Sequence, residues 1–94
     1  MAKASWGGKV IAESPDTIAV EGNQYFPPES VKQEFLKPSD HTSVCRWKGT
    51  AHYFHVAVDG MQNDNAAWYY PHPTSAAAEL QDHIAFWNGV SIEI

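Results

Sequence analysis

The sequence predicts a mainly β protein whose strands are antiparallel and whose helices are two short segments. Runs of β-branched and aromatic residues recur along the chain, and such residues are enriched in strands. The dipeptide Asn88-Gly89 is the one that a two-residue hairpin turn prefers. No strand–helix–strand spacing of the kind that builds a parallel sheet is present. These three observations favour antiparallel pairing.

The first predicted element is a hairpin made of residues 9–14 and 17–22. Pro15 stands between the two strands, where a type I turn needs a fixed φ. Ile18 and Val20 would share one face of the second strand, so we expect the hairpin to be half-buried.

A short helix is predicted around Glu29, which follows two prolines and suits the positive end of a helix dipole. Val31 and Phe35 are four residues apart and would face the core together. Pro38 would end this helix. Residues 39–49 show no periodicity and are predicted to form a polar loop.

The central strand is predicted at residues 50–58, which are rich in aromatic and β-branched side chains. Asp59-Gly60 would end this strand, and residues 65–70 would return beside it. Prolines at positions 71 and 73 would break the return strand. A second short helix is predicted to follow at residues 76–80.

The last predicted element is a hairpin whose strands are residues 83–87 and 90–94. The Asn88-Gly89 pair occupies the turn, because both turn positions need a positive φ that these residues tolerate. Trp87 is expected to face Val90 across the turn.

Composition narrows the classes of protein to which this chain can belong. Its 94 residues suit one domain, which we expect to span residues 1–94. With 44% hydrophobic and 18% charged residues, the chain is not of a disordered type. Six basic and eleven acidic side chains argue against a nucleic-acid partner, and no apolar run approaches the ~18 residues that cross a membrane. The chain opens without a secretory leader and has one cysteine, so we expect a cytoplasmic protein without disulfides.

Five short segments, in order over nearly the whole chain, form a pattern. They are Ile11-Ala12-Glu13-Ser14, Tyr25-Phe26-Pro27, Cys45-x-x-Lys48-Gly49-x-Ala51-x-Tyr53, Ala66-Ala67-Trp68-x-Tyr70-Pro71-x-Pro73 and Ile84-Ala85-Phe86. In this pattern the sequence resembles a small bacterial family, domain of unknown function 427, sometimes labelled nucleotidyltransferase. It departs at Arg46, where the family usually has proline. The resemblance implies a small tent-like domain in which two antiparallel sheets meet at an angle, and it brings no established activity.

The residues themselves do not favour nucleotidyl transfer. That reaction needs carboxylates that converge on a divalent metal and donors that cradle a triphosphate. The sequence has no paired aspartates on a predicted strand and no Gly-x-x-x-x-Gly-Lys loop. His52 and His55 are three residues apart on the predicted strand and would face opposite sides. We therefore expect no metal site and no cofactor.

Cys45 and Lys48 form the pair with the most reactive chemistry. A nearby cation favours the thiolate, while a nucleophile also needs a base, for which His41, His55 and His83 are the candidates. The alternative is that Cys45 is a small buried thiol beneath the central sheet. Cys45 and Lys48 are thus the candidate catalytic residues of one hypothesis, a small enzyme that uses Cys45 or a histidine with Lys48.

Aromatic residues flank the two central predicted strands. Trp68 and Tyr70 share one face by their two-residue spacing, and aromatic walls beside Lys48 suit a planar or anionic small molecule. A small domain also needs aromatic area for its core. Our first hypothesis is a small-molecule binding module with an aromatic-lined pocket between two sheets. Its predicted ligand-binding residues are Cys45, Trp47, Lys48, Tyr53, Trp68 and Tyr70.

A structural oligomer without a ligand is the third hypothesis. Strands near both ends of the chain could pair between molecules through their exposed edges, although the charges of Glu21 and Glu93 favour protected edges. The sequence does not set the oligomeric state.

Overall fold

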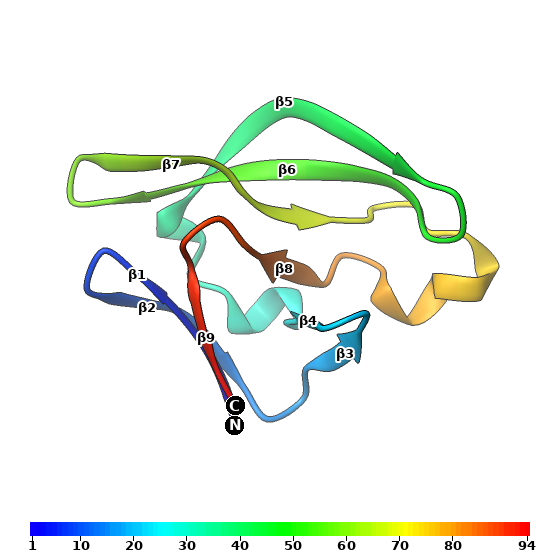
Figure 1. Cartoon of the computed structure of the whole chain (residues 1–94), viewed down its shortest axis with the longest axis horizontal. Coiled ribbons are helices and arrows are strands. Elements are labelled where there is room, and N and C mark those ends of the chain that lie inside the picture. Colours follow the sequence, from blue (N-terminus) through cyan, green and yellow to red (C-terminus); the bar gives the residue numbers. More distant parts are fainter.

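Antiparallel strands dominate the computed structural model, which describes residues 1–94 (Figure 1). The strands are β1 (Ala2–Trp6), β2 (Lys9–Ser14), β3 (Ile18–Val20), β4 (Asn23–Tyr25), β5 (Leu36–Cys45), β6 (Gly49–Val58), β7 (Met61–Tyr69), β8 (Ile84–Phe86) and β9 (Ser91–Glu93). They form three sheets, in the orders β2-β1-β9, β3-β4 and β5-β6-β7-β8. The mainly β, antiparallel prediction is confirmed, with three sheets in place of two.

The first sheet begins with a strand that the sequence reasoning missed. β1 pairs with β2 through a turn at Gly7 and Gly8, whose φ values of 61° and 81° suit glycine. The predicted hairpin of residues 9–14 and 17–22 is therefore wrong. The second of those runs instead supplies β3, which pairs with β4 as a sheet of its own.

The large sheet contains the central strand that the sequence predicts. β6 matches the predicted strand 50–58, and β7 returns beside it after the Asp59-Gly60 turn. The predicted polar loop at residues 39–49 is wrong, because β5 covers most of it and pairs with β6. Most β5 side chains are exposed on both faces, so no alternation of polar and apolar residues marks the strand.

The helical predictions are only partly correct. The region around Glu29 forms two 3-10 segments, Pro28–Ser30 and Gln33–Phe35, with extended backbone between them. There Val31 bridges to Ala12 of β2, so pairing to a strand competes with helix formation. The second helix is present as the 3-10 segment Ser75–Leu80. The structure thus has three 3-10 segments where two short helices were predicted. None of them has the length and apolar character that a membrane-crossing helix requires.

The terminal turn is where the sequence predicts it, but the hairpin is not. Asn88 and Gly89 have φ values of 55° and 94°, and the Val90 N–H donates to the Trp87 carbonyl at 3.2 Å. The strands on the two sides of this turn join different sheets, because β8 pairs with β7 and β9 pairs with β1. The turn therefore crosses between sheets.

Two groups of buried side chains form the core. The larger one has 13 buried residues, among them Ile11, Phe26 and Val56, and lies between the first sheet and the large sheet. The smaller one has six, namely Tyr25, Ala51, Tyr70, Ala77, Leu80 and Ala85. The partly buried Tyr53 and Trp68 pack against this smaller core, which places it directly behind the pocket described next.

Candidate functional site

An open pocket of about 220 Å³ lies where the small sheet meets the large one. β4 supplies two of its residues, β6 and β7 one each, and the others come from the ends of strands and from the β5–β6 turn. The lining residues are Asn23, Tyr25, Lys48, Tyr53, Trp68, Tyr70 and Trp87. Five of these seven side chains are aromatic.

Trp68 is the centre of the aromatic lining. It meets Tyr25 edge to face at a centroid distance of 6.1 Å, and its Nε1–H donates to the Tyr25 hydroxyl at 3.3 Å. It meets Trp87 edge to face at 6.3 Å and lies 6.5 Å from Tyr53. Edge-to-face contacts are favourable because a ring's positive edge meets the negative face of its neighbour. The lining is therefore held in place by ring-to-ring contacts.

Lys48 brings a positive charge to the pocket. Only 5% of the residue is exposed, and its ammonium group forms an ion pair with Glu21 of the β3–β4 turn. The same ammonium lies 5.1 Å from the centroid of Trp47 and 5.9 Å from that of Tyr25. Aromatic faces attract cations, so the rings and the carboxylate together stabilise a buried charge.

The backbone around Lys48 is fixed by the segment that follows β7. The Thr74 N–H donates to the Lys48 carbonyl at 3.0 Å, and the Thr74 hydroxyl donates to the Trp47 carbonyl. Gly49 has a φ of 117° and lies so close to this segment that a Cβ there would be 3.2 Å from the His72 carbonyl oxygen. A glycine directly after Lys48 is thus what lets the two segments approach.

The ionisable groups of the pocket shift one another's pKa. The hydrogen bond and the charge of Lys48 hold the pKa of Glu21 below its usual 4.5. Burial alone would lower the pKa of Lys48, but the hydrogen bond to Glu21 and the neighbouring Tyr25 and Tyr70 outweigh it and raise that pKa. Burial, with a smaller effect of Tyr25, raises the pKa of Tyr70 to about 12. Lys48 is therefore a cation and Tyr70 is neutral at pH 7.

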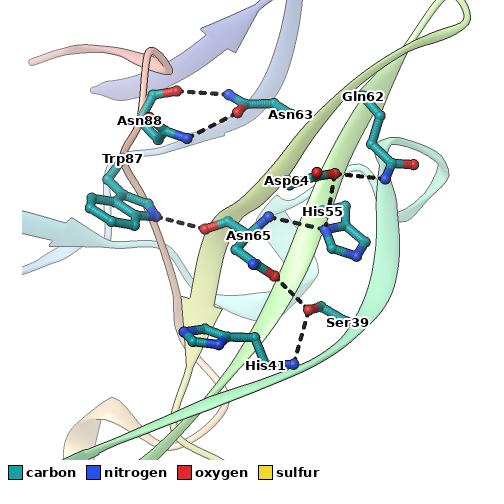
Figure 2. A network of polar contacts seen from close by, with 9 residues as sticks. All are labelled: Ser39, His41, His55, Gln62, Asn63, Asp64, Asn65, Trp87 and Asn88. Carbon is teal, nitrogen blue, oxygen red and sulfur yellow. Dashed lines mark hydrogen bonds and ion pairs between the residues drawn. The ribbon is translucent and has the colours of Figure 1, made fainter.

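Trp87 is positioned by a network of polar contacts around Asn65 (Figure 2). The backbone of Asn65 has a φ of 54° at a β-bulge of β7. Its carbonyl accepts from Trp87 Nε1–H at 2.6 Å, and its amide N–H donates to His55 Nδ1 at 3.0 Å. Its side-chain oxygen accepts from the Ser39 hydroxyl at 2.5 Å. Through Asn65, the bulge thus links Ser39 of β5 and His55 of β6 to the Trp87 indole, which lines the pocket.

The two histidines of the central strand make different contacts. His52 lies 5.9 Å from the ring of Tyr69, whereas His55 accepts the Asn65 N–H, which leaves Nε2 to carry the proton of a neutral ring. No group of three or more His, Cys, Asp or Glu side chains in the structure is placed to hold a metal ion.

Four of the six predicted ligand-binding residues line the pocket, and two do not. Lys48, Tyr53, Trp68 and Tyr70 lie in its wall. Cys45 is half-buried at the end of β5 and packs against the smaller core. Trp47 is 42% exposed and lies against the ammonium of Lys48 outside the wall.

Sequence reasoning missed three pocket residues, Asn23, Tyr25 and Trp87. Tyr25 belongs to the segment Tyr25-Phe26-Pro27, and a single aromatic residue outside the central strands does not by itself indicate a pocket. Asn23 and Trp87 come from β4 and from the turn after β8, and only the tertiary fold places them beside the central strands. A second hollow, of about 430 Å³, lies on the first sheet. Only two of its ten lining residues are hydrophobic, so it offers far less apolar surface to a ligand.

A comparison with protein-family models matches residues 1–94 to a family described as Domain of unknown function (DUF427). The chain belongs to the DUF427 family. A search of curated proteins found no match to the chain. Five of the seven pocket residues, Tyr25, Lys48, Tyr53, Trp68 and Tyr70, stand in the segments through which the sequence resembles DUF427. Most of the pocket lining therefore comes from segments that carry the family resemblance.

Proposed function

We propose that this protein binds a small planar molecule in the aromatic pocket between the small sheet and the large one. The observation that carries the proposal is the convergence of five aromatic side chains and one buried lysine on a single open pocket. Ligand sites are typically apolar concavities with a few polar groups that fix orientation, and this pocket has that composition. The proposal includes a cytoplasmic bacterial protein that binds neither nucleic acid nor membranes. The net charge of −5 supports the part about nucleic acid, because phosphate backbones bind basic surfaces.

The geometry supports a ring stacked among rings. Trp87 is 53% exposed and the Trp68 indole meets it edge to face, so a planar ligand can cover an indole that now faces solvent. Polar groups stand at the sides of the pocket, namely the Asn23 amide, the Lys48 ammonium and the tyrosine hydroxyls. These groups can orient a polar substituent of the ring.

No observation favours the enzyme hypothesis over binding. Cys45 is outside the pocket wall, so a ligand seated there would not meet its thiol. The protonated Lys48 suits the electrophile of that hypothesis, but neither a cysteine nor a histidine lines the pocket beside it to act on a substrate. The oligomer hypothesis rests on strands near both ends of the chain, and β9 has β1 on one side and no partner strand on the other. Glu93 lies in β9, and a charged side chain on an edge strand opposes pairing between molecules.

Two tryptophans provide a matched test of the proposal. Trp87 lines the pocket and is 53% exposed, whereas Trp47 is 42% exposed but lies outside the wall. We expect benzenesulfonamide, a neutral planar probe, to shift the indole N–H signals of Trp68 and Trp87 in a ¹H–¹⁵N correlation spectrum. Because an aromatic contact contributes about 1 kcal/mol, Trp87→Ala should weaken binding about fivefold to tenfold, and Trp47→Ala should change it little. Equal loss in both variants, or no shift at any concentration, would contradict the proposal.

A further inference from the structure

The ion pair at the pocket joins two groups with very different exposure. The side chain of Lys48 is 7% exposed, whereas that of Glu21 is 58% exposed. Only Glu21 provides a carboxylate within ion-pair distance of Lys48. The positive charge is therefore fixed in the protein, while its counter-charge stands largely in water.

This asymmetry means that Lys48 needs an anion but does not need Glu21 in particular. A buried ammonium without a counter-charge is costly, because the protein replaces the water that would solvate it. The Glu21 carboxylate can return to water at little cost, because it is already more than half exposed. A different anion that reaches Lys48 would leave neither charge buried alone.

Glu21 lies in the exposed turn of the small sheet, whose strands pack against the smaller core. Glu21 and Gly22 form the turn of a two-stranded sheet in which β3 and β4 share only three residue pairs. Two-stranded sheets are marginally stable by themselves. Glu21 also has a φ of 53°, a left-handed conformation that is costly for a residue with a side chain. Rotation of the exposed Glu21 side chain would take its carboxylate away from Lys48 while Val20, which packs against the smaller core, stays in place.

Lys48 also lines the pocket, so a ligand seated among the aromatic rings lies beside the same ammonium. We propose, resting on the proposed function, that the ligand is a planar ring that carries an acidic group, and that Glu21 is a built-in competitor which this group replaces on Lys48. Ring contacts with Trp68 and Trp87 supply the affinity common to all planar ligands. The exchange of one anion for another at Lys48 lets an acidic group enter the pocket without leaving the buried ammonium unpaired.

The competition has a measurable consequence. In the wild-type protein, an anion must take Lys48 from Glu21, so it gains little over a neutral ring of the same shape. In Glu21→Gln the competing side chain has no charge. A bound anion then forms a charge-assisted contact with Lys48 without breaking an ion pair. Such a contact corresponds to about a tenfold change in affinity.

The test uses two probes that differ mainly in charge, benzenesulfonate and benzenesulfonamide, titrated into the full chain with the indole N–H signals of Trp68 and Trp87 as the readout. We expect Glu21→Gln to bind benzenesulfonate about tenfold more tightly than the wild type, and benzenesulfonamide with unchanged affinity. Glu13→Gln is the matched control, because it removes the same charge from an exposed position of β2 that makes no ion pair. It should change neither affinity. Lys48→Met should remove the benzenesulfonate gain when combined with Glu21→Gln.

A second measurement needs no substitution. Lowering the pH through the pKa of Glu21 discharges the competitor while benzenesulfonate stays ionised, so wild-type affinity for benzenesulfonate should rise and that for benzenesulfonamide should not. If both probes bind but Glu21→Gln and low pH leave benzenesulfonate affinity unchanged, the competition is overturned and the binding function stands. If neither probe shifts the two indoles in any variant, the binding function fails, and the inference fails with it.

Discussion

At the scale of single residues, the pocket depends on groups whose charges are set by burial and by neighbouring side chains. Lys48 is kept charged by a partner 27 positions away in the sequence. Tyr70 is kept neutral because it is 5% exposed and next to Tyr25. Neither property can be read from the sequence, because both depend on contacts between distant segments. The sequence shows only that a lysine and a tyrosine stand next to the two central strands.

The ionisation of Tyr70 is a prediction at this scale. Burial raises its pKa from the ordinary 10.0 to about 12, so the folded protein holds this proton more tightly than the unfolded chain does. The resulting stabilisation is complete below pH 10.0 and is lost as the pH rises through about 12. An absorbance titration of tyrosinate should show one late step near pH 12. Tyr70→Phe should remove that step and Tyr69→Phe should keep it, so a late step that survives Tyr70→Phe would contradict the assignment.

At the scale of elements, the sequence predicts strands better than it predicts their partners. β6 and β7 are evident because they are rich in aromatic and β-branched residues and are separated by Asp59-Gly60. β5 is missed because both of its faces are mostly exposed, which leaves no pattern to detect. The Asn88-Gly89 turn is correctly placed, yet β9 pairs with β1 from the other end of the chain. Turn chemistry is local, whereas strand pairing is decided by burial across the whole molecule.

The connection between β5 and β6 gives a prediction at this scale. In Gly49→Ala the new Cβ would be 3.2 Å from the His72 carbonyl oxygen, in a backbone conformation with a φ of 117° that alanine rarely adopts. We expect a loss of about 2 kcal/mol or more in the free energy of unfolding, measured by urea denaturation. Gly8→Ala is the control, because Gly8 also has a positive φ but a Cβ there would meet nothing within 4 Å. Its cost should be about 1 kcal/mol. Equal losses would show that backbone conformation alone, and not the close approach, requires glycine at position 49.

At the scale of the whole molecule, one ion pair links the small sheet to the β5–β6 turn of the large one. Glu21 belongs to the turn of the β3–β4 sheet, and Lys48 comes from the turn before β6. β4 also contacts β8, and Phe26 bridges to Ile84. The pocket therefore lies at a junction whose two sides are joined both by backbone pairing and by charge.

This junction makes the stability of the fold depend on pH in a defined way. The lowered pKa of Glu21 means that its contribution is complete above pH 4.5 and is lost as the pH falls through the folded-state pKa. The raised pKa of Lys48 means that its contribution is complete below pH 10.5 and is lost as the pH rises through its folded-state pKa. The difference in melting temperature between the wild type and Glu21→Gln should thus be largest between these limits and shrink at both ends. A melting-temperature difference that stays constant down to strongly acidic pH would contradict this prediction. In the control variant Glu13→Gln, the difference from the wild type should not depend on pH in this way.

The pairing of β1 with both β2 and β9 has a consequence for the order in which the fold can be completed. β1 is the middle strand of its sheet and is synthesised before the other eight strands, whereas its second neighbour, β9, is synthesised after them. During translation one edge of β1 must therefore wait, unpaired, until nearly all of residues 1–94 have left the ribosome. The two ends of the described chain lie side by side once β9 has docked (Figure 1). A circular permutant that joins the two ends would synthesise β9 and β1 as neighbours and would remove this wait.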